Sequence, residues 1–373
     1  MKPSKPYPEF PLTANGNGQW SKKIRGKVHY FGVWADPQAA VNKYCEVRDF
    51  LLAGLVPPTT AALVADILNS FLGYKENARV EGDITERSYK EYVAVCDTIA
   101  TCLGTKRPIE TIHANDLLRL RTALCKGKKG QRVSPITQKR NLGIARMVFS
   151  HANDELGANI RFKKALRSPK ARTIRQQRNE NGERLFSAKE VRILVKTAKP
   201  QLKAMVLLGI NCGFGNADCG TLPIEAVDLE NRWHNYWRPK TQIQRRCPLW
   251  PETSQALQKV IGERTSGLVF ITKYGNPWWV EEKRDPIAFE FRKLTQALGI
   301  YRKGITTFYS LRRTFETIAS TARVNQAVID SIMGHAPAAS DMAAIYRQRV
   351  FDDSLIECVN HVRGWVRGRI SIG

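Results

Sequence analysis

The pattern of apolar and polar positions predicts strands at the beginning of the chain and helices over most of the remaining residues. Residues 18–34, "GQWSKKIRGKVHYFGVW", alternate apolar and polar side chains on both sides of Arg25-Gly26. Because successive side chains of a strand point to opposite faces, the alternation predicts a β-hairpin or a three-stranded sheet. Asp36-Pro37 then provides an N-cap and a first-turn proline for a helix that ends near Ala53.

A long helical stretch follows the loop-like segment "GLVPPTT" at 54–60. Apolar residues recur there at helical spacing and predict four helices, at 61–75, 85–103, 115–125 and 135–156. Gly157 stands where the last of these helices needs a C-cap. Four helices of this length make a compact bundle.

The C-terminal part begins after a polar segment, "SPKARTIRQQRNENGERL" at 168–185, which is typical of a linker. Ser187 and Glu190 form a capping box just after Phe186. Further helices are expected at 201–210, 252–263, 286–298, 310–321 and 325–333, and strands within 232–250, which turns around 241–244, and at 267–272. The predicted domains are an N-terminal module (1–57), a helical domain (58–167), the linker (168–185) and a C-terminal domain (186–373).

The net charge points to a polyanionic partner. The 373 residues include 59 Lys and Arg against 34 Asp and Glu, a formal charge of +25. Nucleic acid is the first candidate, and an anionic membrane surface is the alternative. No stretch approaches the roughly 18 apolar residues of a spanning helix, and the beginning "MKPSKPYPEF" lacks the apolar core of a signal peptide. We therefore expect a soluble cytoplasmic protein with no membrane partner.

Much of the positive charge lies in the second half of the helical stretch. Residues 119–178 contain seventeen Lys or Arg but only two acidic residues. Neutralising DNA phosphates is the simplest use for such a surplus, since each contact releases counterions. The outward residues of the N-terminal hairpin are also basic, as in an accessory DNA-binding arm or in a strand edge kept soluble by lysines. The candidate DNA-binding residues are Lys22, Lys23, Arg25, Lys27, Lys128, Lys129, Arg132, Lys139, Arg140, Lys163 and Lys164.

The eight cysteines are dispersed and form no C-x-x-C motif or zinc-type spacing with histidine. They are interpreted as reduced structural thiols rather than as metal or redox sites, so no metal and no cofactor is expected. These residues are Cys45, Cys96, Cys102, Cys125, Cys212, Cys219, Cys247 and Cys358.

Four short motifs of the C-terminal part follow one another in an order that is typical of one protein family. They are Lys240-Thr241, "YSLRRTFET" at 309–317, "MGHA" at 333–336, and Tyr346. In this order and at these separations they resemble the catalytic domain of tyrosine recombinases, the phage integrase family, over about 186–366. The preceding helical domain looks like that family's core-binding domain. The resemblance implies a mainly α fold with small β-sheets, in which a small β-rich module precedes the helical domain and a mixed α/β catalytic domain.

The resemblance also implies an activity and a set of roles. Tyr346 is expected to attack a DNA phosphodiester and form a 3′-phosphotyrosyl intermediate, and Arg312 to bind the phosphate with its planar fork. Lys240 matches the lysine that protonates the leaving 5′ hydroxyl, and His335 the residue that hydrogen-bonds a nonbridging oxygen. The expected partner is double-stranded DNA, bound by a homo-oligomer that is a tetramer on DNA.

The chain departs from the family at two positions. In "GFGNADCGTL" (213–222) Gly215 stands where the family has its first catalytic arginine, with Asp218 at the carboxylate position. Tyr309 stands where the family's box begins with histidine. Losing one of two phosphate-binding cations costs several kcal/mol of transition-state stabilisation unless another cation enters. The possible compensating cations are Arg245, Arg246 and Arg313.

The last segment, 352–370, places Leu355, Val359, Val362 and Val366 at helical spacing. This apolar stripe fits two arrangements, packing on its own domain or docking onto a neighbouring subunit. Three functions remain open at this point: a recombinase, a recombinase-derived DNA-binding protein that no longer cleaves, and a type IB topoisomerase, which uses the same chemistry.

Overall fold

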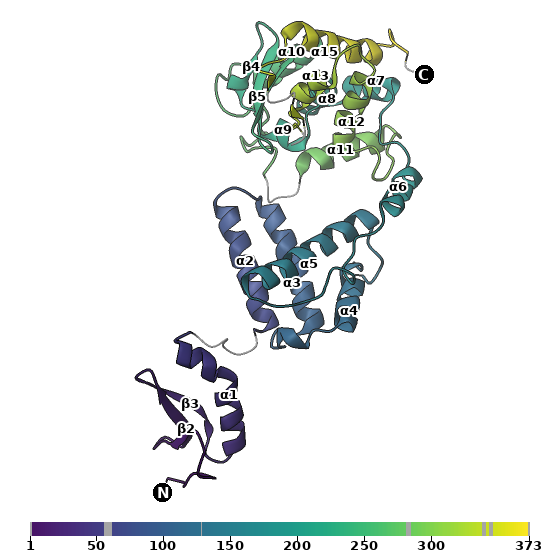
Figure 1. Ribbon diagram of the computed structural model, residues 1–373. Coiled ribbons are helices and arrows are strands. Elements are labelled where there is room, and N and C mark those ends of the chain that lie inside the picture. The colour runs from purple at the N-terminus through teal and green to yellow at the C-terminus, as the bar shows by residue number, and fades with distance from the viewer. Residues whose placement is uncertain are drawn as a thin grey trace. The chain divides into compact units, whose positions relative to one another are not determined.

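The computed structural model describes residues 2–55, 62–127, 129–280, 285–337, 341–342 and 346–371. The chain forms two compact units, Met1–Lys170 and Ala171–Gly373 (Figure 1). The division falls inside the segment that the sequence marks as a linker. Among the described residues, no helix combines the length and the apolar character that crossing a bilayer requires.

The N-terminal module is a three-stranded antiparallel sheet covered by one helix. Its strands β1 (Thr13–Ala14), β2 (Gln19–Ile24) and β3 (Lys27–Val33) pair in chain order, and α1 (Pro37–Ala53) follows. Arg25 and Gly26 form the tight turn with φ of 46° and 84°, a conformation that suits glycine at the second position. Asp36 caps α1 by accepting a hydrogen bond from the Ala39 amide at 2.9 Å. The predicted strands and helix are therefore present.

The helical domain contains four long helices around one apolar core. They are α2 (Val64–Val80), α3 (Glu86–Leu103), α4 (Ala114–Leu124) and α5 (Pro135–Glu155), with the short 3₁₀ helix η1 (Ile109–Thr111) before α4. Three of them start and end within two residues of the prediction. The exception is α2, which runs to Val80 because the polar residues after Lys75 continue the helix on its exposed side. An ion pair from Arg79 to Glu76 at 2.5 Å supports that last turn.

The polar segment before the C-terminal domain differs from the expected linker without regular structure. Part of it forms a helix, α6 (Ala171–Glu180), which has no buried residue. The sequence lacks apolar anchors there because no face of α6 is covered by the other described residues.

The C-terminal unit packs its helices around α8 (Pro200–Asn211), which is buried along most of its length. A small antiparallel sheet of β4 (Val227–Asp228), β5 (Trp233–Arg238) and β6 (Ile243–Pro248) lies in the same unit. The remaining elements are α7 (Ala188–Thr197), α9 (Asn216–Gly220), η2 (Ile224–Ala226), α10 (Pro251–Ile261), α11 (Pro286–Ala297), α12 (Phe308–Ala319), α13 (Gln326–Met333) and α15 (Asp352–Val366).

One predicted strand is wrong. Residues 267–272 make only isolated bridges, from Leu268 to Pro223 and from Ile271 to Pro277. Val269 and Phe270 are fully buried, so the apolar run reflects a core-filling segment rather than a strand of the sheet. The short elements α9 and β4 were not predicted, because two to five residues are too few to show a period.

The C-terminal helix α15 packs on its own domain. Leu355, Val359 and Val362 of its apolar stripe are buried, and the indole nitrogen of Trp250 donates to the carbonyl of Val359 at 3.0 Å. Of the two arrangements open for this stripe, the structure has the intramolecular one. The same residues are therefore not free to dock onto a neighbouring subunit.

Candidate active site

Arg312 joins three separate segments of the C-terminal unit. It lies on α12 with 1% of its surface exposed, and its guanidinium donates to the carbonyls of Gly213 and of Met333, the latter at 2.7 Å. Burial, and next the charge of Arg238, lower the pKa of Arg312 to about 10. The arginine of the 309–317 box is thus held beside the 213–218 segment and the end of α13.

Asp218 anchors a group of buried cations. One carboxylate oxygen accepts the Gly215 amide at 2.7 Å, and the other lies 3.2 Å from Nη2 of Arg245 and 3.9 Å from Nε of Arg238. We call Arg238, Arg245 and Arg312, with Asp218, the arginine cluster. Arg245 is fully buried with its guanidinium 4.4 Å from the ring centre of Phe214. Burial lowers the pKa of Arg245.

His335 follows the end of α13 and is oriented by that helix. Its Nδ1 lies 3.1 Å from the carboxylate of Asp330, and its backbone amide donates to the Asp330 carbonyl at 2.9 Å. Gly334 makes the turn possible because it ends the helix with a φ of 63°. With Nδ1 engaged by Asp330, the Nε2 edge of the half-exposed His335 remains for a substrate.

Lys240 sits at the tip of the β5–β6 hairpin and is exposed. The neighbouring Thr241 donates its hydroxyl hydrogen to the Gly334 carbonyl at 3.0 Å. That bond ties the hairpin tip to the turn that carries His335. The lysine therefore extends from a loop attached to the site but is not itself fixed.

Tyr309 and Arg313 lie together on α12. Tyr309 is 43% exposed, and its ring lies next to the backbone of Gly215, where an added Cβ would be 3.5 Å from Cδ2 of the ring. The guanidinium of Arg313 lies 5.6 Å from the centre of that ring. Burial, and then the charge of Arg184, lower the pKa of Arg313.

Arg246, a predicted compensating cation, is engaged elsewhere. Its guanidinium binds the carboxylate of Asp352 in a two-pronged contact at 2.9 and 2.7 Å and lies 4.0 Å from the ring centre of Trp233. Because neighbouring strand residues face opposite sides, Arg246 points away from the side of β6 that carries Arg245. This geometry gives Arg246 no route into the arginine cluster.

Tyr346 is the most exposed of the predicted catalytic residues, at 77%. Within the part of the chain that the structure describes, none of its side-chain contacts joins it to Arg312. Residues 343–345, which precede it, lie outside the described ranges. Its hydroxyl is therefore accessible, as a nucleophile for a bound duplex must be.

The sequence profile of the phage integrase family matches residues 179–351. This part of the chain is therefore similar to that family. No curated protein sequence matches the chain.

Solved structures of integrases have the same fold. Lambda integrase, solved as a dimer bound to a COC′ core site, superposes with a TM-score of 0.58 at 15% identity, over 94% of this chain and 98% of that one. The Tn1549 transposon integrase in complex with transposon right end DNA gives a TM-score of 0.56 at 18% identity, over 79% of this chain and 97% of that one. The predicted fold class, mainly α with small sheets, is thereby confirmed.

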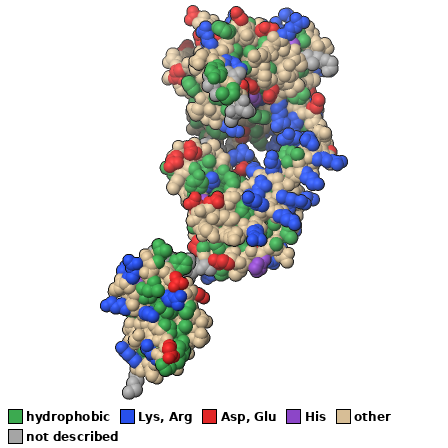
Figure 2. All heavy atoms as spheres, viewed as in Figure 1, with side chains coloured by type: hydrophobic (Ala, Val, Ile, Leu, Met, Phe, Trp, Pro, Cys, Tyr) green, Lys and Arg blue, Asp and Glu red, His purple; other side chains and the backbone are tan. Residues whose placement is uncertain are grey.

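The candidate DNA-binding residues are mostly exposed. Lys22 is half-buried, with its ammonium 4.6 Å from the ring centre of Tyr44, and Lys128 lies outside the described residues. The other described candidates are exposed: Lys23, Arg25, Lys27, Lys129, Arg132, Lys139, Arg140, Lys163 and Lys164. Figure 2 shows Lys and Arg side chains crowded on the side of the helical domain that carries α4.

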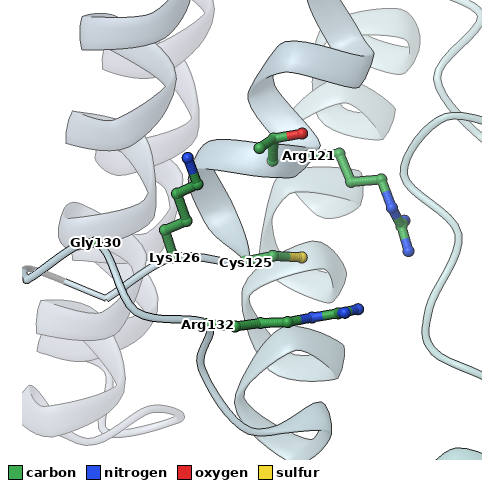
Figure 3. A pocket seen from close by; sticks show the side chains of 6 residues that line it. Arg121, Cys125, Lys126, Gly130 and Arg132 are labelled. Atoms are coloured by element: carbon green, nitrogen blue, oxygen red, sulfur yellow. The ribbon is translucent and has the colours of Figure 1, made fainter.

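A cationic hollow of about 310 Å³ lies beside the end of α4. Arg121, Lys126 and Arg132 line it, and Figure 3 shows Arg121 and Arg132 extending toward the same side. Arg121 also donates to the carbonyls of Ala165 and Arg167, which holds the segment of Lys163 and Lys164 against α4.

Three buried side chains come close enough to be considered as metal ligands. Ligand atoms of Cys212, His234 and Cys247 all lie within 4.8 Å of one another, and neither ring nitrogen of His234 has a hydrogen-bond partner in the described ranges. Burial raises the pKa of Cys247 and lowers the pKa of His234, so both are neutral. The interpretation of these cysteines as structural thiols stays a prediction.

The sequence interpretation missed Arg238. Its side chain is only 12% exposed. A signal existed in the strand period. His234, Tyr236 and Arg238 are alternate residues of β5 and share a face, and the first two are buried.

Proposed function

We propose that the chain is a site-specific tyrosine recombinase that cleaves and rejoins double-stranded DNA through Tyr346. Its role would be the integration or excision of a mobile genetic element. One observation carries the proposal. The bonds from Arg312 to Gly213 and Met333 gather the segments that match the family's motifs into a single cationic site.

The proposed reaction exchanges one phosphodiester for another. The hydroxyl oxygen of Tyr346 bonds to the scissile phosphorus, and the bond from phosphorus to the 5′ oxygen breaks. The phenolic proton is released to solvent, and the 5′ oxygen takes a proton from the ammonium of Lys240. The reverse attack by a 5′ hydroxyl rejoins the strand, and no ATP is consumed because the bond energy is retained in the phosphotyrosyl link.

Charge on the nonbridging oxygens is stabilised by fixed donors in this proposal. The planar fork of Arg312 is held by two carbonyls, so its orientation is fixed before a phosphate binds. His335, oriented by Asp330, would donate from Nε2 to the same phosphate in the form that carries a proton on both ring nitrogens. Tyr309 stands at the family's histidine position and contributes its hydroxyl as a neutral donor.

Duplex DNA would be held by exposed cations outside this site. The hollow lined by Arg121, Lys126 and Arg132 and the exposed lysines at 163–164 offer phosphate contacts on the helical domain. The basic hairpin of the N-terminal module offers a second, separate contact surface.

The active assembly on DNA would be a homo-oligomer. Lambda integrase, which shares the fold, has been solved as a tetramer bound to a Holliday junction, with a TM-score of 0.57 at 16% identity over 90% of this chain and 98% of that one. Strand exchange between two duplexes needs four cleavages, which supports four copies of this chain. Because the apolar stripe of α15 is buried against its own domain, the contacts between copies would use other residues.

A second candidate function is DNA binding without cleavage. Gly215 favours it, because a glycine there leaves the family's first arginine position without a cation. Tyr309 favours it too, since a phenol with its ordinary pKa near 10 is a poor proton shuttle at neutral pH.

One experiment separates the two candidates. The full chain first selects its binding site from a random-sequence duplex pool, and nicked duplexes carrying that site are then tested for a covalent adduct on a denaturing gel. We expect an adduct that disappears in Tyr346→Phe. Tyr274→Phe is the matched control, because Tyr274 is 76% exposed, close to the value for Tyr346. Site-specific binding with no adduct in any nicked duplex would reject the recombinase and leave the binding protein.

A further inference from the structure

Arg238 turns into the site from the last position of β5. Its Nη1 donates to the Gly334 carbonyl at 3.1 Å, and its Nε lies 3.9 Å from the Asp218 carboxylate. That Nε has no hydrogen-bond partner among the residues that the structure describes. The guanidinium of Arg238 is therefore fixed through Nη1, and its other N–H groups remain for another acceptor.

Arg238 is a neighbour of Arg312. The two arginines donate to the carbonyls of consecutive residues, Gly334 and Met333, and the charge of Arg238 lowers the pKa of Arg312. Two guanidinium groups so close repel each other unless an anion lies between them.

The arginine cluster contains more positive than negative charge. Three guanidinium groups face the single carboxylate of Asp218, and that carboxylate bonds directly only to Arg245 among them. Buried charge without a partner is costly, so an excess of this kind indicates an anion that the site is built to receive. A DNA phosphodiester carries one negative charge on two nonbridging oxygens, which fits the forks of Arg238 and Arg312.

Arg238 and Gly215 both lie next to the carboxylate of Asp218. The Gly215 amide and the Arg238 guanidinium both approach the carboxylate of Asp218, from its two oxygens. A side chain at 215 would start from the edge of Tyr309 and pass the same carboxylate. Arg238 thus brings a guanidinium to the region that an arginine at 215 would serve, but from the hairpin instead of from α9.

The other candidate cations are less suited. Arg245 is fully buried and already paired with Asp218, so it has no exposed edge for DNA. Arg246 is bound to Asp352, and the guanidinium of Arg313 lies against the ring of Tyr309. Of these arginines and Arg238, only Arg238 combines a place beside Arg312 with partial exposure.

We propose that Arg238 is a catalytic residue, which binds a nonbridging oxygen of the scissile phosphate and replaces the arginine that the family carries at the position of Gly215. This inference rests on the proposed recombinase function. It predicts that the site is complete, and that Gly215 marks a relocated cation rather than a lost one.

The test measures the rate of adduct formation on the selected nicked duplex, with full-length variants. Arg238→Ala is expected to lower the rate about 100-fold or more, as for the loss of one oxyanion donor, while the affinity for the duplex stays within about threefold. Arg292→Ala is the matched control, because it removes an exposed arginine of α11 that lies outside the arginine cluster. Its rate is expected to stay within about threefold of that of the unaltered chain.

A second arm uses a duplex with a methylphosphonate at the cleaved position, which lacks one charged nonbridging oxygen. If Arg238 neutralises that oxygen, Arg238→Ala and the unaltered chain should react at rates within about threefold on this substrate. A purely structural role of Arg238 would leave the same 100-fold deficit on both substrates and would overturn the proposal.

A third arm restores the family's arrangement. Gly215 has an extended backbone with φ of −95°, and an added Cβ would meet Asp218 no closer than 3.3 Å, so an arginine fits there. Gly215→Arg combined with Arg238→Ala is expected to recover at least about tenfold of the lost rate. The proposal is overturned if Arg238→Ala alone retains a third or more of the rate. The failure of the proposed function looks different, because then the unaltered chain forms no adduct at all.

Discussion

Arg312 and Arg238 hydrogen-bond to the carbonyl oxygens of two consecutive residues, Met333 and Gly334, at the end of α13. That turn therefore fixes two guanidinium groups and also starts the segment with His335. Any change in its backbone moves all three groups together.

Gly334 is expected to tolerate no side chain. Its φ of 63° costs an alanine about 1–2 kcal/mol, and a Cβ would lie 2.7 Å from Cδ of Arg245 and 3.0 Å from Cδ of Arg238. Gly334→Ala should therefore lower the midpoint of urea unfolding and the adduct rate. Gly299→Ala is the matched control, because Gly299 has a φ of 69° and open space around it. Equal losses in both variants would mean that strain alone acts, without the contacts to the arginines.

Asp218 is expected to be essential for folding of the C-terminal unit. Asp218→Asn leaves the buried Arg245 without a counter-charge, and breaking a buried pair in this way costs about 3–5 kcal/mol. Urea unfolding followed by tryptophan fluorescence measures the loss, since all the tryptophans outside the N-terminal module lie in this unit. Asp353→Asn, an exposed change on α15, should cost less than about 0.5 kcal/mol. A loss below about 1 kcal/mol in Asp218→Asn would contradict this role.

Asp330 is expected to act through His335. Asp330→Ala removes the acceptor that fixes the imidazole and should lower the adduct rate roughly ten- to a hundredfold, with DNA affinity unchanged. Gln326→Ala offers a sharp control, because Gln326 donates to the same Asp330 oxygen at 3.2 Å without touching His335. If both variants lose the same activity, the carboxylate serves the helix rather than the histidine.

The stability of α4 is expected to depend on pH through Asp116. Hydrogen bonds from Arg107, from the His113 amide and from Arg119 hold the pKa of the Asp116 carboxyl well below its ordinary value of 3.8. A carboxyl with a lowered pKa stabilises the folded state fully above its ordinary pKa, and that contribution is lost as the pH falls below about 4. Hydrogen–deuterium exchange of α4 peptides should accelerate over that range.

Two variants test the assignment to Asp116. Asp116→Asn should accelerate exchange in α4 at neutral pH and flatten its acid dependence. Asp154→Asn, at an exposed position of α5, should leave both unchanged. An acid dependence that survives in Asp116→Asn would assign it to other carboxyls.

The sequence predicted the elements that carry strong periods or caps. The hairpin around Arg25-Gly26, the capping box of Ser187 and Glu190, and the helix around Arg312 all lie where they were expected, because local chemistry specifies them. The buried strand-like run at 267–272 failed because burial alone does not distinguish a strand from a core-filling loop.

The composition of the site was harder to predict than its motifs. Gly215, Arg238 and Asp218 come together only because β5 and α9 lie in one fold, and nothing in the spacing of these residues along the chain reveals it. Arg245 and Arg246 are adjacent and chemically equal in sequence, yet one is buried against Phe214 and the other binds Asp352. The pleat of β6 separates them.

The pair between Arg246 and Asp352 has a consequence for how copies of the chain cooperate. It ties the beginning of α15 to β6, the strand that carries Arg245, and Asp352 lies six positions after Tyr346, a span of at most about 22 Å. The pair therefore limits how far Tyr346 can move from the arginine cluster of its own chain. A mixture of Tyr346→Phe and Arg312→Ala chains should therefore form no covalent adduct. If the tyrosine of one chain acted in the site of a neighbouring chain, the mixture would recover cleavage.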